Sequence, residues 1–164
     1  MIYLLLNKNT NITMRVFLII TLSKIWDRFY HLCVNIALYI FRSIVHFLAE
    51  NSGLVGIASI KELPILDGLD PNHLVYLFAS LWGATQVSLT LILLILFIKY
   101  KNLIPLIYLV CLLDHCFRLI SGSLHPLTED YYINTPPGVI ANIPLIIYFI
   151  SMFYLSLKGN TQND

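Results

Sequence analysis

Asp114 and Arg118 lie within an apolar stretch, residues 103–122, that is long enough to cross a lipid bilayer. A charged side chain near the centre of a membrane helix costs at least about 2.5 kcal/mol, so such residues usually face the protein interior and form pairs. Residues four positions apart share one face of a helix, and an acid before a base is the favourable order. We therefore expect Asp114 and Arg118 to hydrogen-bond to each other and to point at other polar groups.

A second set of polar residues recurs at steps of three or four within residues 25–49. This spacing places them on one stripe of a helix, and a stripe this long is expected to face other helices rather than lipid. The opposite face, which includes Ile36, Phe41, Ile44 and Phe47, is suited to lipid. The residues of the stripe are Arg28, His31, Asn35, Tyr39, Arg42 and His46.

These two stretches predict one shared polar site. A helical rise of about 1.5 Å per residue puts Arg42 and Arg118 at similar depth, if both spans run outward. If the two spans touch, the polar residues gather in the outer half of the membrane, and a glutamine of the second span closes the site from below. The candidate ligand-binding residues are Arg42, His46, Gln86, Asp114 and Arg118.

Two arginines facing one carboxylate leave this site with one positive charge in excess, which solvent, a loop acid such as Glu50 or Glu129, or a ligand would have to offset. In one interpretation, the Asp114–Arg118 pair only fixes helix register and Arg42 extends to the outer headgroups. In the other, the site binds an anion or a strongly hydrogen-bonding molecule.

Catalysis by Asp114 or His46 has weak support, because no nucleophile or phosphate loop accompanies them. A metal site formed by His46, Cys111, His115 and Cys116 lacks an evident tetrahedral spacing. We therefore assign no catalytic residue, no metal and no cofactor. The sequence leaves the question of enzymatic activity undecided, and favours a protein that is not an enzyme.

The composition predicts an integral membrane protein surrounded by the lipid bilayer. Of the 164 residues, 58% are hydrophobic and 12% are charged, against roughly 25% charged in soluble domains. The net charge is +1, and no basic stripe interleaved with aromatic residues supports nucleic-acid binding. Cys33, Cys111 and Cys116 lie in apolar stretches without a CxxC motif, which is typical of cysteines that serve in packing.

The hydrophobic pattern predicts an all-α fold, a four-helix transmembrane bundle formed by residues 25–157. Residues 1–24 predict an amphipathic segment at the cytoplasmic surface, and residues 158–164 predict a short polar tail. Glycine and proline mark residues 50–73 as a loop. The expected spans are residues 25–49, 73–98, 103–122 and 138–157.

Small residues in the second span predict a close contact with another helix. Ser80, Ala84 and Ser88 form a small-xxx-small series, flanked by Ala79 and Gly83. Such residues let helix backbones approach closely in lipid.

The distribution of basic residues predicts that both termini lie in the cytoplasm. Lys61 is the only lysine or arginine in the two outer loops, which also contain several acids. The basic residues on the expected inner side are Lys8, Arg15, Lys24, Arg28, Lys99, Lys101 and Lys158.

Residues 77–157 contain four short motifs: WGATQ at 82–86, the basic turn Lys99–Lys101, the segment around Arg118, and TPPG at 135–138. Through them the chain resembles the DoxX-like group of small four-helix bacterial membrane proteins, and Arg42 in FRSIVHF resembles the first-helix arginine of that group. The resemblance implies a left-handed bundle in a bacterial inner membrane. Some members are linked to quinone-coupled sulfur oxidation or redox-stress complexes, and many have no assigned activity. The chain differs from them in its long N-terminal extension and its long first outer loop.

We expect a non-enzymatic membrane component or partner subunit with a polar core, whose partner is another membrane protein or a second copy of the chain. The alternative is a binding site for a quinone-like head group or an anion, with a redox association. A void bordered by the candidate residues would favour ligand binding, whereas close packing would favour a scaffold.

Overall fold

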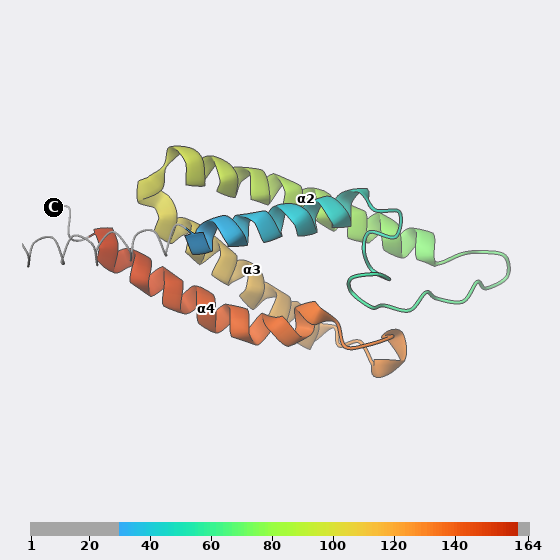
Figure 1. The fold of residues 1–164 in the computed structure, drawn as a ribbon. Helices are drawn as coiled ribbons and strands as arrows, with labels where there is room; N and C mark the ends of the chain where they lie inside the picture. Colours follow the sequence, from blue (N-terminus) through green and yellow to red (C-terminus); the bar gives the residue numbers. More distant parts are fainter. Residues whose placement is uncertain (1–29, 161–164) are drawn as a thin grey trace, which may run out of the picture. The chain divides into compact units, whose positions relative to one another are not determined.

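The computed structural model describes residues 30–160, and these are helical apart from the connecting loops (Figure 1). The described residues include four helices that are long and apolar enough to cross a membrane, which confirms the expected all-α four-helix architecture of an integral membrane protein. The predicted amphipathic segment 1–24 and residues 161–164 of the tail lie outside the described part. The four candidate spans are Tyr30–Leu48, Asn72–Lys99, Lys101–Leu124 and Pro137–Leu157.

The chain divides into two compact units, residues 1–35 and 36–164, and the boundary falls within the first helix. In the first unit, the side-chain amide of Asn35 donates to the carbonyl of His31 at 2.8 Å, a bond along the helix itself. All that follows concerns the second unit. Its helices after the first are α2 (Asn72–Lys99), α3 (Ile104–Leu124) and α4 (Pro137–Asn160), with short 3-10 turns at Lys101–Leu103 and Glu129–Tyr131.

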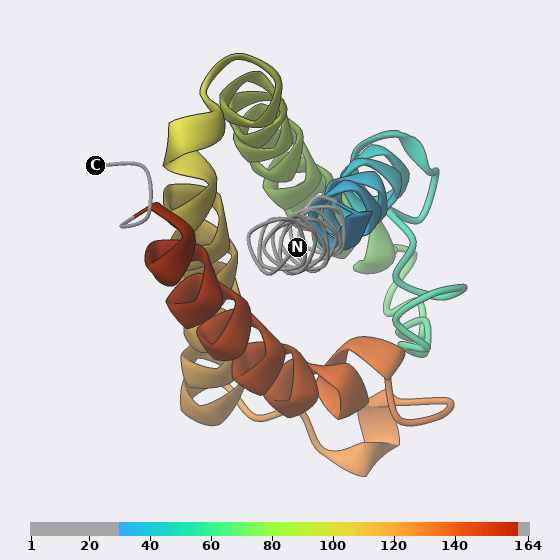
Figure 2. The same cartoon turned by 60° about the vertical axis from the view of Figure 1, so that its left-hand side comes forward.

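Residues 36–48 of the first helix lie beside α2, and α3 packs along α4 (Figures 1 and 2). The 3-10 turn at Lys101–Leu103 connects α2 to α3, which begins with Pro105 in its first turn, where the missing N–H of proline costs little. The core between these helices holds both apolar and polar side chains. Its buried apolar residues include Tyr39, Leu93, Ile107, Tyr108, Cys111, Phe149 and Met152.

The inward face of the first helix is rotated slightly from the predicted stripe. Phe41, Ile44 and Phe47 are exposed as expected, but Ile36, assigned to the lipid face, is only 6% exposed. The buried positions recur at three- and four-residue steps, which is the period of one helix face. This rotation leaves Arg42 at the edge of the face, partly exposed. The buried residues of the face are Ile36, Tyr39, Ser43 and His46.

Gly83 is the point of closest approach between the first helix and α2. A Cβ atom added there would lie 2.5 Å from the carbonyl carbon of His46 and 2.5 Å from the amide nitrogen of Phe47. The hydroxyl of Ser80 donates to the Phe47 carbonyl at 3.0 Å. The predicted close contact is thus confirmed at Gly83, whereas the hydroxyl of Ser88 bonds within its own helix.

Two loops, residues 49–71 before α2 and residues 125–136 before α4, are joined through their backbones. The charge distribution predicts that both are outer loops, and we keep that name for them. Ile60 and Tyr132 form an isolated antiparallel bridge. The amide of Lys61 donates to the carbonyl of Tyr131 at 2.9 Å, and the amide of Ile133 donates to the carbonyl of Ser59 at 2.7 Å. These bonds hold the loop before α2 against the loop before α4.

Asn72 anchors the first outer loop to the start of α2. Its side-chain amide bonds both backbone groups of Leu63, each at 2.8 Å. The carboxylate of Asp70 accepts the backbone N–H of Asn72 at 2.9 Å, and this bond lowers the pKa of Asp70. The stability that this bond contributes is therefore present above the ordinary aspartate pKa and is lost as the pH falls below it.

Gly83→Ala tests the close approach. The added methyl group meets backbone atoms that cannot rotate away, so we expect the free energy of unfolding to fall by about 1–3 kcal/mol, measured by chemical denaturation in detergent. Gly122→Ala is the matched control, because its methyl group meets nothing within 4 Å and a helical alanine is favoured over glycine by up to about 1 kcal/mol. An equal loss in both variants would contradict the proposed contact.

Candidate functional site

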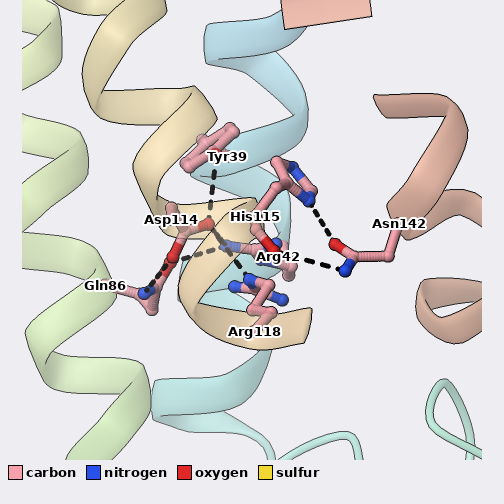
Figure 3. Close-up of polar contacts among 7 residues, drawn as sticks. All are labelled: Tyr39, Arg42, Gln86, Asp114, His115, Arg118 and Asn142. Atoms are coloured by element: carbon pink, nitrogen blue, oxygen red, sulfur yellow. Dashed lines mark hydrogen bonds and ion pairs between the residues drawn. The ribbon is translucent and has the colours of Figure 1, made fainter. Parts of the chain in front are cut away.

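Asp114 of α3 is the centre of the polar site (Figure 3). Its Oδ2 atom accepts the Nε–H of Arg118 at 3.0 Å and the hydroxyl of Tyr39 at 3.1 Å. The same oxygen accepts an Nη2–H of Arg42 at 3.4 Å. The predicted Asp114–Arg118 bond is therefore confirmed, and the first helix supplies two further donors to the same carboxylate.

Gln86 adds α2 to this arrangement. Its side-chain oxygen accepts from Nη2 of Arg42 at 2.6 Å, and its amide nitrogen lies 3.5 Å from Oδ1 of Asp114. Three helices are thus connected through one carboxylate (Figure 3). We call Tyr39, Arg42, Gln86, Asp114 and Arg118 the Asp114 cluster.

The excess positive charge of the Asp114 cluster lies against aromatic rings. The guanidinium carbon of Arg118 is 5.1 Å from the ring centre of Trp82. That of Arg42 is 4.8 Å from the Tyr39 ring and 5.9 Å from the Trp82 ring. A cation over an aromatic face is attracted by the ring quadrupole, which is worth about 0.5–2 kcal/mol depending on desolvation. These rings therefore offset part of the charge.

The two loop acids that could offset this charge, Glu50 and Glu129, do not pair with the arginines. Among the described residues, the ion pairs of Arg42 and Arg118 are both made with Asp114, at 3.4 and 3.0 Å. The two acids belong to the loops, whereas the arginines lie on the helices one or more turns from the loop ends, so aromatic rings and the Gln86 amide are the nearer groups.

His46 lies beside the Asp114 cluster and bonds in another direction. Its Nδ1 is 2.6 Å from the carbonyl oxygen of Ser52, and because a carbonyl only accepts, the ring N–H is the donor. The ring packs on Trp82 with 4.7 Å between centroids. The hydroxyl of Ser52 in turn donates to the carbonyl of Tyr76 at 3.0 Å. His46 thus connects the first helix to the outer loop, and no hydrogen bond joins it to Asp114 in the described part of the chain.

Two buried guanidinium nitrogens in the cluster have no acceptor. These are Nε of Arg42 and Nη2 of Arg118, neither of which has a hydrogen-bond partner among the residues that the structure describes. A buried N–H without a partner costs about 1–3 kcal/mol, and more for a charged group. The cluster therefore combines one carboxylate that faces four donor groups with two guanidinium nitrogens that have no acceptor among the described residues.

A second polar contact joins α3 to α4 one residue beyond Asp114. Nδ1 of His115 donates to the side-chain oxygen of Asn142 at 2.8 Å, and the Asn142 amide donates back to the His115 carbonyl at 3.2 Å (Figure 3). The His115 ring also stacks on Phe149, 5.3 Å away. Sequence reasoning did not find this pair. The available signal was that Asn142 is an isolated polar side chain within an apolar helix, and that His115 is a polar side chain next to Asp114.

Comparison with protein-family models, curated proteins and solved structures gives no match. In the described part of the chain, no group of three or more His, Cys, Asp and Glu side chains is placed to hold a metal ion. The function is therefore inferred from the hydrogen bonds and charges of the Asp114 cluster.

Asp114→Asn tests the central role of the carboxylate. The change removes the one negative charge that faces Arg42 and Arg118, so we expect a loss of about 3 kcal/mol in the free energy of unfolding, the lower end of the range for a broken buried pair because these side chains are partly exposed. Asp67→Asn in the exposed outer loop is the control, with an expected change within about 0.5 kcal/mol. Similar values for both variants would contradict the role assigned to Asp114.

Asn142→Ala tests the contact between α3 and α4. The change leaves the His115 ring N–H without its acceptor, so we expect a loss of about 1–2 kcal/mol in the free energy of unfolding. Asn134→Ala, in the exposed part of the second outer loop, should change it by less than about 0.5 kcal/mol. A negligible effect of Asn142→Ala would show that apolar packing alone holds these two helices together.

Proposed function

We propose that the protein is a non-enzymatic component of a membrane, in which the Asp114 cluster fixes the positions of the first helix, α2 and α3. The observation that carries this proposal is the convergence of four donor groups on one carboxylate. Ligand-binding or catalytic carboxylates need a free acceptor position. Three of the donors lie on Oδ2 and the amide of Gln86 lies 3.5 Å from Oδ1, so most of the roughly four lone-pair positions of the carboxylate face donors of the protein itself.

Acid–base catalysis by Asp114 is disfavoured for the same reason. A general base must accept a proton from the substrate within hydrogen-bond distance. Here the nearest donors are two guanidinium groups, a tyrosine hydroxyl and an amide, all from the protein itself. Two adjacent cations also stabilise the ionised form of the carboxylate, which weakens it as a base.

The proposal includes a membrane and an orientation. The charge asymmetry of the loops supports cytoplasmic termini, and the resemblance to the DoxX-like group supports a bacterial inner membrane. As a component of this kind, the chain would act through another membrane protein or a second copy of itself. The apolar side chains exposed on all four candidate spans provide surface for lipid and for such a partner.

The second candidate function is the binding of an anion or a quinone-like head group at the arginines. It is favoured by the two buried guanidinium nitrogens without acceptors, on Arg42 and Arg118. It is also favoured by the charge balance of the cluster, since two guanidinium groups face one carboxylate. An anionic oxygen is the group that would satisfy both features.

Arg118→Gln separates the two candidates. In the structural proposal, removing one of two cations leaves a balanced Arg42–Asp114 pair, so the loss of unfolding free energy should be less than half of that caused by Asp114→Asn. The structural proposal also predicts that the purified wild-type protein carries no stoichiometric small molecule, as measured by native mass spectrometry.

A stoichiometric anion or quinone in the wild-type protein would contradict the structural proposal if it is lost in Arg118→Gln. Lys99→Gln is the matched control, because it removes a cation at the C-terminal end of α2, outside the Asp114 cluster. A molecule retained by Arg118→Gln would lie outside the Asp114 cluster and would contradict the second candidate instead.

A further inference from the structure

A cavity of about 190 Å³ lies between the outer loops and the first turns of α2. Its walls come from three segments: residues 54–63 of the first outer loop, the start of α2, and residues 127–131 of the second outer loop. The loops stand at the end of the helices opposite to the turn between α2 and α3 (Figure 1). The lining residues are Leu54, Val55, Ile60, Lys61, Leu63, Asn72, Val75, Tyr76, Leu127 and Tyr131.

Hydrogen bonds of the backbone hold these walls in place. The amide of Lys61 donates to the carbonyl of Tyr131 at 2.9 Å, and this bond joins the two loops across the cavity. Asn72 fixes Leu63 to the start of α2 through two bonds of 2.8 Å. The cavity is therefore preformed, and a ligand would not have to order its walls on binding.

Four side chains of the lining carry a polar group, those of Lys61, Asn72, Tyr76 and Tyr131, and two of these groups are bonded within the protein. The amide of Asn72 is bonded to Leu63, and the hydroxyl of Tyr76 donates to Glu62 at 3.0 Å. Lys61 is the only charged residue of the lining, and its ammonium group makes no ion pair with any residue in the described part of the chain. Lys61 is exposed and the surface that faces the cavity is almost wholly apolar, so its aliphatic stem lines the cavity and its ammonium group stands at the opening.

We propose that this cavity binds a small carboxylate with a short apolar chain, with the chain against the apolar walls and the carboxylate on Lys61. The size fits such a molecule: an apolar cavity of about 150 Å³ holds benzene, and drug-sized ligands need about 300–1,000 Å³. The charge fits as well, because an ammonium group next to apolar surface complements an anionic head joined to an apolar tail.

Three acids neighbour lining residues in the sequence, Glu62, Glu129 and Asp130, and none of them belongs to the lining. The carboxylate of Glu62 accepts the Tyr76 hydroxyl. The site is separate from the Asp114 cluster, with which it shares no residue. A failure to find carboxylate binding in the cavity would therefore leave the proposed function unaffected.

Titration calorimetry with hexanoate tests the proposal on the full chain in nanodiscs of a zwitterionic lipid, with empty nanodiscs subtracted. We expect saturable binding of hexanoate, about 15-fold tighter than butyrate, because each buried methylene contributes about 0.8 kcal/mol or roughly fourfold in affinity. Hexanol tests the charge and should bind more weakly than hexanoate. Absence of saturable hexanoate binding would overturn the proposal.

Substitutions locate the binding site. Lys61→Gln should weaken hexanoate binding about threefold to tenfold, while Lys99→Gln should leave it unchanged. Val55→Phe should abolish binding by filling the cavity, and if that variant does not fold, Leu127→Phe fills it from the second outer loop. Equal binding by wild type and Lys61→Gln, or by wild type and the folded filling variant, would overturn the assignment.

Discussion

A carboxylate inside a membrane protein needs hydrogen-bond donors from the protein, because lipid supplies none. Asp114 meets this requirement with donors from three helices, two of them guanidinium groups. Each of those guanidinium groups has the same need for a counter-charge. The positions of the first helix, α2 and α3 are thereby coupled, since moving any one of them leaves a charged group without a partner. Apolar packing in lipid has no comparable directional preference.

The steric fit between helices makes this coupling possible. Arg42 reaches Gln86 at 2.6 Å because the first helix and α2 approach closely at Gly83, one turn of α2 earlier. A side chain at that position would separate the two backbones. Trp82, next to Gly83, then lies within reach of both arginines and of His46. The small residue and the large one beside it thus have complementary roles, contact between backbones and shielding of charge.

The molecule offers positive charge to ligands in two different environments. The arginines of the Asp114 cluster are partly buried among helices and share one carboxylate, so their charge is largely used within the protein. Lys61 stands at the edge of an apolar cavity between the outer loops, and its charge is not used by the described residues. Water is nearer to Lys61 than to the Asp114 cluster. An ion pair at Lys61 is therefore weaker, but the ligand also loses less hydration when it binds there. Exchangeable binding is therefore favoured at Lys61, and a permanent structural contact at Asp114.

The sequence by itself determined the features that depend on one helix at a time. The four apolar spans follow from hydrophobic runs and loop residues, and the Asp114–Arg118 bond follows from the i, i+4 spacing, because helix geometry fixes both. The inward direction of Tyr39 and His46 follows from the same periodicity. Periodicity defines a face only to within part of a turn, however, and this is why Ile36 was placed on the wrong side.

Only the tertiary structure decided which groups on different helices meet. It brought the side chains of Gln86 and Tyr39 to the Asp114 carboxylate and the Trp82 ring to the two arginines. It also gave His46 a hydrogen bond to the Ser52 carbonyl rather than to Asp114. It paired His115 with Asn142 and formed the cavity between the outer loops. These contacts depend on the rotation and axial shift of each helix relative to its neighbours. Packing of whole surfaces sets those quantities, and no spacing within a single segment encodes them.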